Sequence, residues 1–367
     1  MNTPNQRAPV LTVDCDIHPT LSDRRAADFL TEPWRTRFLS GNKGAGGIGV
    51  WNPNGVRRAD ARLPDGRYID ESAETLGAHF LDHYDIAFGV LNPGSLGRAL
   101  TPEPDYAAAM VAATNDVVAH DWLPADARLR ASILVSPVDP HLAAREIERW
   151  AGHPGFVQVL MPAAAAMPYG NRFYHPIYGA AEKQNLPVAI HPGAEGTGVA
   201  GAPTGTGYTN GYLEWHTGLM TGYVSHLISL VTEGVFQKFP GLRWVLVEGG
   251  VAWLPPLLWR FDKNWKALRL TAPWLTRPPS QIVADHFFLT TQPIEEPDNI
   301  EHLRAIMNMF PAEKMVLFSS DYPHWDGDTP DFCARAFPKD LRARVLHETA
   351  RELYNLPAAA ASEAPDA

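Results

Sequence analysis

Met315-Val-Leu-Phe-Ser-Ser-Asp321-Tyr-Pro-His324-Trp-Asp326 is the stretch of the chain that decides the fold. Four apolar residues run directly into two serines and an aspartate, and a proline and aromatic residues follow. Such a run is typical of a buried parallel strand, and the polar residues after it indicate a loop at the carboxyl end of that strand. A carboxylate at the edge of a core is costly unless a cation or hydrogen-bond donors meet it, so we expect Asp321 to have such a partner.

Seven earlier apolar runs have the same form, because each is short and ends in polar or turn-forming residues. They cover residues 10–14, 86–91, 131–136, 156–161, 186–190, 243–247 and 286–289. Helical patterns alternate with them, at residues 73–84, 105–122, 142–150, 174–184, 213–236, 252–268 and 341–353. Eight strand–helix units in a row predict an α/β fold, a closed (β/α)8 TIM-type barrel. The sequence disfavours an open dinucleotide-binding sheet, because no Gly-x-Gly-x-x-Gly motif follows the first strand.

Two long glycine-rich segments interrupt this alternation. Residues 40–67 follow the first strand and residues 194–212 follow the fifth, so we predict loop insertions on the carboxyl face of the barrel, where they would cover a pocket and become ordered when a ligand binds. The predicted domain organisation is an N-terminal extension of residues 1–9, a single barrel of residues 10–356 and a disordered tail of residues 357–367.

Composition and charge favour a globular protein that acts on small molecules. The net charge is −10, and no basic run or stripe is present, which argues against nucleic acid or an anionic membrane as a partner. Cys15 and Cys333 stand far apart and predict no disulfide framework, and the N-terminal residues lack the apolar core of a signal peptide. We therefore expect a cytoplasmic protein with a small-molecule substrate, and the sequence is compatible with a homo-oligomer.

Residues of the type that bind metals stand at several of the predicted strand ends, which converge on one face of such a barrel. Asp16 and His18 are two apart, so that in extended chain their side chains project to the same side. His191 follows the fifth strand, Glu248 the sixth and Asp321 the eighth. Two imidazoles with carboxylates suit Zn, Fe or Mn, and the set predicts one or two divalent ions. The alternative is that these are unrelated turn and core residues.

Other residues are candidates for a supporting role near this site. His324 lies three residues after Asp321 and would orient that carboxylate or the substrate. Each of the remaining candidates is either an additional ligand or substrate contact, or an ordinary packed residue: His216, His226, Trp51, Tyr212, Trp215 and Trp325.

Together, these motifs resemble the amidohydrolase superfamily. The resemblance rests on Asp16-x-His18, on Ile190-His191-Pro-Gly, on residues 239–255 around Glu248-Gly-Gly, and on Phe318-Ser-Ser-Asp321-Tyr-Pro-His-Trp. It spans residues 13–356 and is strongest for the branch that contains aminocarboxymuconate-semialdehyde decarboxylase and related aromatic-acid decarboxylases.

The resemblance implies a barrel with a divalent metal held by Asp16, His18, His191 and Asp321. It also implies a catalytic histidine directly before the paired glycines, where this chain has Glu248. Because a carboxylate does not simply replace an imidazole in protonating carbon, this difference argues against a decarboxylase.

The predicted activity is therefore metal-dependent hydrolysis, in which metal-activated water attacks an amide, ester, lactone or thioester. Asp321 would accept the proton of the water, and Glu248 would assist or bind a second ion. The alternative is non-oxidative decarboxylation of an aromatic or unsaturated acid. A third class, a non-catalytic barrel used for binding, agrees less well with an intact ligand set.

Overall fold

A single parallel sheet forms the centre of the computed structural model, which describes residues 12–46, 49–50 and 57–357. Its strands follow one another in chain order, each parallel to the next. They are β1 (Thr12–Ile17), β2 (Ile86–Leu91), β3 (Leu129–Leu134), β4 (Phe156–Pro162), β5 (Val188–His191), β6 (Trp244–Leu246), β7 (Phe287–Thr290) and β8 (Val316–Leu317).

The last strand returns to the first and so closes the barrel. The Cys15 amide donates to the Phe318 carbonyl at 3.0 Å, and the His18 amide donates to the Tyr322 carbonyl at 2.8 Å. A parallel bridge also joins Ile17 to Tyr322. Since β8 is short, these contacts beyond its end carry much of the closure, and they bring the ends of β1 and β8 together at the carboxyl face.

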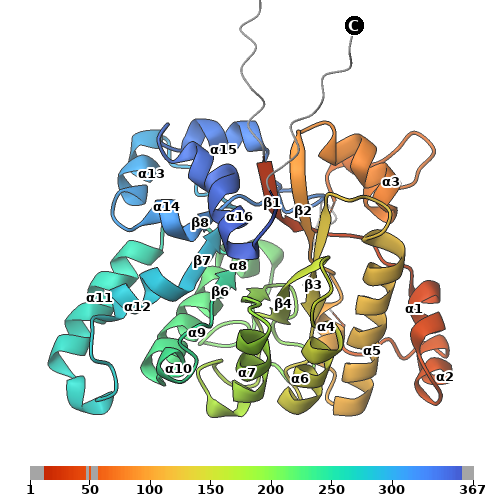
Figure 1. Cartoon of the computed structure of the whole chain (residues 1–367), viewed down its shortest axis with the longest axis horizontal. Coiled ribbons are helices and arrows are strands. Elements are labelled where there is room, and N and C mark those ends of the chain that lie inside the picture. The colour runs from red at the N-terminus through yellow and green to blue at the C-terminus, as the bar shows by residue number, and fades with distance from the viewer. Residues whose placement is uncertain (1–11, 47–48, 51–56, 358–367) are drawn as a thin grey trace, which may run out of the picture.

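Helices surround the strands, with α11 and α12 on one side of the barrel and α1 and α2 on the other (Figure 1). They are α1 (Asp23–Phe29), α2 (Trp34–Leu39), α3 (Ala73–Leu76), α4 (Leu96–Ala99), α5 (Pro104–Val117), α6 (Pro140–Arg149), α7 (His175–Lys183), α8 (Tyr212–Thr217), α9 (Met220–Thr232), α10 (Val235–Lys238), α11 (Leu254–Ala267), α12 (Pro279–His286), α13 (Ile300–Met307), α14 (Ala312–Met315), α15 (Pro330–Ala336) and α16 (Thr349–Tyr354). Among the described residues, none of these helices has both the length and the apolar character needed to span a membrane.

Strand residues alternate between two apolar layers. In β6, Trp244 and Leu246 belong to the outer layer between strands and helices, whereas Val245 belongs to the inner layer, which fills the barrel. Side chains on successive strand positions point to opposite faces, and helices cover the outside of a parallel barrel, so both faces of each strand are buried. This explains why the strands read in the sequence as nearly continuous apolar runs.

The predicted barrel is confirmed, with differences in detail. The helix predicted at residues 213–236 is three helices, α8 to α10, with breaks near Gly218 and Gly234; Gly234 has φ +72°, which a glycine adopts without strain. The helices predicted at 73–84, 105–122 and 341–353 each contain a π-helical turn. The predicted extension of residues 1–9 and nearly all of the predicted tail lie outside the described residues.

His226, a candidate ligand in the sequence, joins α9 to the segment after β4. Its Nε2 donates to the Ala163 carbonyl at 2.7 Å, while its Nδ1 accepts the Tyr169 amide at 3.1 Å. Both nitrogens of the neutral ring are thus used for packing, and burial lowers the pKa of His226 to about 4.

This buried histidine predicts a loss of stability in acid. The unfolded chain takes up a proton near pH 6.5 and the folded chain only near pH 4, so the free energy of unfolding falls as the pH drops through this window, by about 2.5 kcal/mol at pH 4.5. His226→Gln keeps a donor for Ala163 but gains no proton. Urea unfolding at pH 7.5 and 4.5 should show a loss smaller by about that amount in the variant. Equal losses in both proteins would show that His226 already carries its proton in the fold, or does not control the acid response.

Candidate metal centre

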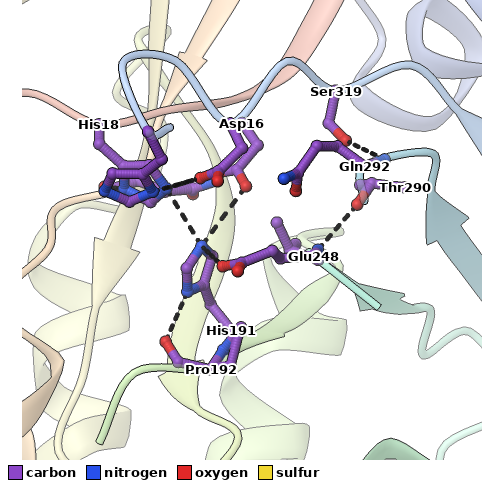
Figure 2. Close-up of polar contacts among 12 residues, drawn as sticks. Asp16, His18, His191, Pro192, Glu248, Thr290, Gln292 and Ser319 are labelled. Carbon is purple, nitrogen blue, oxygen red and sulfur yellow. Dashed lines mark hydrogen bonds and ion pairs between the residues drawn. The ribbon is translucent and has the colours of Figure 1, made fainter. Parts of the chain in front are cut away.

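Asp16, His18, His191 and Asp321 come together at the carboxyl ends of β1, β5 and β8, with one ligand atom from each within 4.8 Å of the others. Figure 2 shows Asp16 and His18 approaching His191 from the opposite side of the site. All four residues are buried. The structure therefore brings together residues that are separated by up to 305 positions in the chain.

A bulge in β1 aims the first two of these side chains. Asp14 pairs with Gly89 and Ile17 with Leu91, so three steps along β1 are matched by two along β2. The Asp14 Oδ1 atom accepts the Asp16 amide at 3.1 Å, which satisfies a donor that the bulge removes from the ladder. Bulges commonly redirect side chains beside active sites, and this one turns Asp16 toward His191.

Both histidines are held with their Nε2 lone pairs directed into the site. His18 Nδ1 lies 2.9 Å from the Asn92 carbonyl oxygen, and His191 Nδ1 lies 2.7 Å from that of Pro192. A carbonyl oxygen only accepts, so each Nδ1 carries the hydrogen and each neutral ring presents Nε2 as an acceptor. These two Nε2 atoms are 3.2 Å apart, and a cation between them removes their repulsion.

The two carboxylates each leave one oxygen for such a cation. Asp16 Oδ2 and Asp321 Oδ2 are buried and have no hydrogen-bond partner among the described residues. Asp16 Oδ1, by contrast, accepts the Asn92 side-chain amide at 2.8 Å. Buried oxygens without donors are costly, and two of them beside two imidazole nitrogens form a mixed N/O set that fits a divalent ion.

The electrostatics of the site point the same way. Burial opposes ionisation of Asp16, but the nearby His18 and His191 rings outweigh it and hold its pKa well below the ordinary range. Burial would lower the pKa of His18, yet Asp16 and Asp321 raise it well above its usual value. The site therefore favours positive charge between its carboxylates, which either protons or a metal ion supplies.

Asp321 and Glu248 both have left-handed backbone, at φ +57° and +61°. Non-glycine residues rarely adopt this conformation, and it costs about 1–3 kcal/mol unless the surroundings enforce it. At Asp321 the surroundings include His18 Nε2 at 2.8 Å and His324 Nδ1 at 2.7 Å from Oδ1. The ring of His324 also stacks on that of His18, with centroids 4.3 Å apart. His324 thus contacts both a carboxylate and an imidazole of the group.

Glu248 contacts the group from the end of β6 but is not one of its four members. Its Oε2 lies 3.2 Å from His191 Nε2, and its amide donates to Thr290 Oγ1 at 2.9 Å (Figure 2). Burial raises the pKa of Glu248 well above its usual value, and the carboxylates of Asp321, Asp16 and Asp326 add to this effect.

The paired glycines after Glu248 allow this close approach. A Cβ atom on Gly249 would lie 2.8 Å from the Tyr223 ring, and Gly250 has φ +63° with Pro293 and Glu295 close to the position of a Cβ atom. Larger residues at either position would move the backbone that carries Glu248.

An aromatic rim, formed by Tyr212, His216 and Trp325, stands beside Glu248. The His216 Nε2 atom lies 3.1 Å from Asp326 Oδ2 and 3.9 Å from Glu248 Oε1. The rings of Tyr212 and Trp325 are 5.4 and 5.5 Å from that of His216, and Trp325 donates to the Tyr212 hydroxyl at 3.2 Å. The rim thus offers ring faces and polar edges beside the metal group.

The structure separates the remaining candidates. Trp215 packs against Tyr212 behind the rim, His226 lies in the packing contact described above, and Trp51 lies outside the described residues. Sequence reasoning missed Asn92 and Asp326 as partners of the site. At Asn92 the signal was a polar residue directly after a predicted strand. Asp326 is the last residue of the stretch 315–326, which decides the fold.

Comparison with known proteins identifies the family. The sequence model described as amidohydrolase matches residues 13–356. The chain belongs to the amidohydrolase family. Gamma-resorcylate decarboxylase of Rhodococcus jostii (strain RHA1) is 24% identical over 265 residues, which cover 66% of this amidohydrolase and 75% of the relative.

Two solved structures show the same fold. 5-Carboxyvanillate decarboxylase from Sphingomonas paucimobilis matches with a TM-score of 0.68 and 21% identity, over 95% of this amidohydrolase and 100% of that chain. Dihydroxybenzoic acid decarboxylase from Polaromonas sp. JS666, with bound manganese and the inhibitor 2-nitroresorcinol, matches with a TM-score of 0.65 and 18% identity, over 94% of this amidohydrolase and 97% of that chain. The predicted membership of the amidohydrolase superfamily is confirmed by the match of the family model.

The predicted hydrolytic activity is wrong, because the similar proteins are decarboxylases. The prediction assigned protonation of the substrate carbon only to the residue at position 248. The glutamate found there was therefore taken as evidence against decarboxylation. The structure shows that a carboxylate and an imidazole, those of Asp321 and His324, are hydrogen-bonded to each other at the metal group. The alternative prediction, decarboxylation, is the one that these comparisons support.

The geometry predicts which histidines bind metal. His191→Ala removes one of the two facing Nε2 atoms, so we expect the dissociation constant for Mn(II) to rise at least about a hundredfold. His216→Ala is the matched control, because its ring lies beside the group but faces Glu248 and Asp326. It should change the constant by less than about threefold. Calorimetric titration of chelator-treated protein measures both values, and near-normal affinity in His191→Ala would remove His191 from the ligand set.

Proposed function

We propose that the protein is a metal-dependent, non-oxidative decarboxylase of a hydroxylated aromatic acid. The observation that carries the proposal is the group of two histidines and two carboxylates at the strand ends of an amidohydrolase barrel. Similar proteins that cover most of the chain are decarboxylases of gamma-resorcylate, 5-carboxyvanillate and 2,6-dihydroxybenzoate. These acids share an aromatic ring with a carboxylate and oxygen substituents.

Asp16, His18, His191 and Asp321 would hold the ion. Manganese is our choice because it is bound in the similar Polaromonas structure. A divalent ion held there would supply a Lewis acid that orients an oxygen-substituted aromatic acid and stabilises negative charge on its oxygen atoms.

The aromatic rim supports a flat substrate. Ring faces bind other rings by offset or edge contacts, and Tyr212, His216 and Trp325 are already in mutual ring contact beside Glu248. Trp325 is 41% exposed, so one side of the rim is open to an entering molecule. We assign to Glu248 and His216 the orientation of a polar ring substituent, because both present hydrogen-bonding atoms between the rim and His191.

Decarboxylation requires a proton at the ring carbon that bears the carboxylate. The carbon takes up the proton, the bond to the carboxylate breaks, and the electron pair returns to the ring as carbon dioxide leaves. We assign proton delivery to Asp321, because it belongs to the group that faces the substrate and accepts a hydrogen bond from His324. The side chain of His324 is 24% exposed, so it connects this buried carboxylate to solvent for a new proton after each turnover.

The activity and the role of Asp321 are tested together. Manganese-loaded protein should release carbon dioxide from at least one member of a panel of mono- and dihydroxybenzoic acids. The loss of the ultraviolet absorbance of the substrate measures the reaction. Asp321→Asn keeps an oxygen ligand but has no proton to deliver, so kcat should fall at least about a hundredfold while half or more of the metal remains. Glu248→Gln is the comparison, and it should raise KM more than it lowers kcat.

Two results would contradict this account. Absence of carbon dioxide from the whole panel, in protein shown to contain metal, would remove aromatic-acid decarboxylation. A near-normal kcat in Asp321→Asn would leave the reaction in place but would move proton delivery to another residue.

A further inference from the structure

A row of polar side chains crosses the interior of the barrel below the metal group. Ser132 and Gln158 are register partners on β3 and β4, and Asn92 directly follows the β2 residue that pairs with Ala131. Asp16 stands at the same level on β1. All four side chains are fully buried. Barrel interiors are usually filled by layers of branched apolar residues, so a polar layer next to four metal-binding side chains requires a reason.

The hydrogen bonds in this layer form one consistent set of donors and acceptors. The Ser132 hydroxyl and the Gln158 side-chain amide both donate to Asn92 Oδ1, at 2.5 and 3.3 Å. This leaves the Asn92 amide nitrogen free to donate to Asp16 Oδ1 at 2.8 Å. At the other end, Gln158 Oε1 accepts the Tyr354 hydroxyl at 2.8 Å. The Tyr354 hydroxyl thus favours one orientation of the Gln158 amide, and Gln158 in turn supports the orientation of Asn92 that the Cys15 carbonyl and Asp16 also favour.

Asn92 is bonded to four consecutive residues, the last three of β1 and His18 directly after it. Its amide nitrogen donates to the Ile17 carbonyl, its side chain donates to the Cys15 carbonyl and to Asp16, and its own carbonyl accepts His18 Nδ1. One residue thus determines which oxygen of Asp16 and which nitrogen of His18 remain available for a cation. Turning its side-chain amide over would place an oxygen against Asp16 Oδ1.

The chain of bonds begins on the C-terminal helix. Tyr354 is the last residue of α16 and lies in the inner apolar layer beside Val13 and Cys15. Arg243 Nη1 donates to the Leu353 carbonyl at 3.1 Å, which ties the end of α16 to the segment that enters β6. The end of α16 is therefore anchored from outside the metal group, and hydrogen bonds through Gln158 and Asn92 connect the Tyr354 hydroxyl to Asp16.

We propose that Tyr354 and Gln158 are positioning residues for the metal centre, acting through Asn92 on Asp16 and His18. The C-terminal helix then contributes to metal affinity although it supplies no ligand. The proposal concerns metal binding and holds whichever substrate the enzyme uses. Failure of the decarboxylase assay would leave it untouched, because its test contains no substrate.

The test is Mn(II) affinity in the full-length protein after removal of metal, measured from the electron paramagnetic resonance signal of free Mn(II). Asn92→Ala should weaken binding at least about tenfold, as expected for a partner of a ligand. Gln158→Met and Tyr354→Phe change little volume and should weaken it about fivefold and threefold, with a changed spectrum of the bound ion. Tyr178→Phe is the matched control, because its buried hydroxyl also donates a hydrogen bond, to the Tyr169 carbonyl, but lies outside this row.

The control separates positioning from general stability. Tyr178→Phe should lower the free energy of unfolding of the metal-free protein but leave the Mn(II) constant within about twofold. If Asn92→Ala does not fold, the two milder variants decide. Binding within twofold of wild type in both Gln158→Met and Tyr354→Phe overturns the proposal, and so does an equal loss of affinity in Tyr178→Phe.

Discussion

Two imidazole nitrogens that face each other 3.2 Å apart, beside two buried carboxylates, are the constraint on which this structure depends. The carbonyls of Asn92 and Pro192 take the hydrogen on the Nδ1 side of each ring, so two neutral rings would face each other with one acceptor each, and the site requires a proton or a cation between them. Like acceptors in a medium of low dielectric repel strongly, and a cation between them converts repulsion into four attractive contacts. The barrel therefore holds an arrangement that requires positive charge at its centre, which a proton on His18 or a metal ion supplies.

The surrounding structure is built to keep that arrangement from relaxing. The β1 bulge, the left-handed backbone at Asp321 and Glu248, and the paired glycines are local departures from regular structure at the carboxyl face. An outer layer of apolar residues on all eight strands packs against the helices and offsets such costs. In the interior, part of the usual apolar filling is replaced by the polar row from Asp16 to Gln158. The apolar layer that stabilises the fold thus lies between the strands and the helices, whereas the metal-binding residues and their polar partners lie inside the barrel.

The sequence allowed much of the fold to be predicted, because parallel strands buried on both faces appear as apolar runs whatever their neighbours are. Convergence of strand ends then predicted that Asp16, His18, His191 and Asp321 lie near one another. The bulge in β1 and the helix breaks near Gly218 and Gly234 depend on contacts with distant segments, which no local pattern contains. The roles of Asn92 and Asp326 were missed for the same reason, since each acts through a residue far away in the chain.

The most direct measurement of the central claim is anomalous diffraction from a crystal of the metal-free protein soaked in MnCl2, recorded near the manganese absorption edge. The account predicts a strong peak between His18 and His191, with both Nε2 atoms and an oxygen of Asp16 and of Asp321 at about 2.0–2.3 Å from the ion. The two Nε2 atoms should move apart to admit it. A map with no peak there, or with the ion held only by Glu248, His216 and Asp326, would contradict the account.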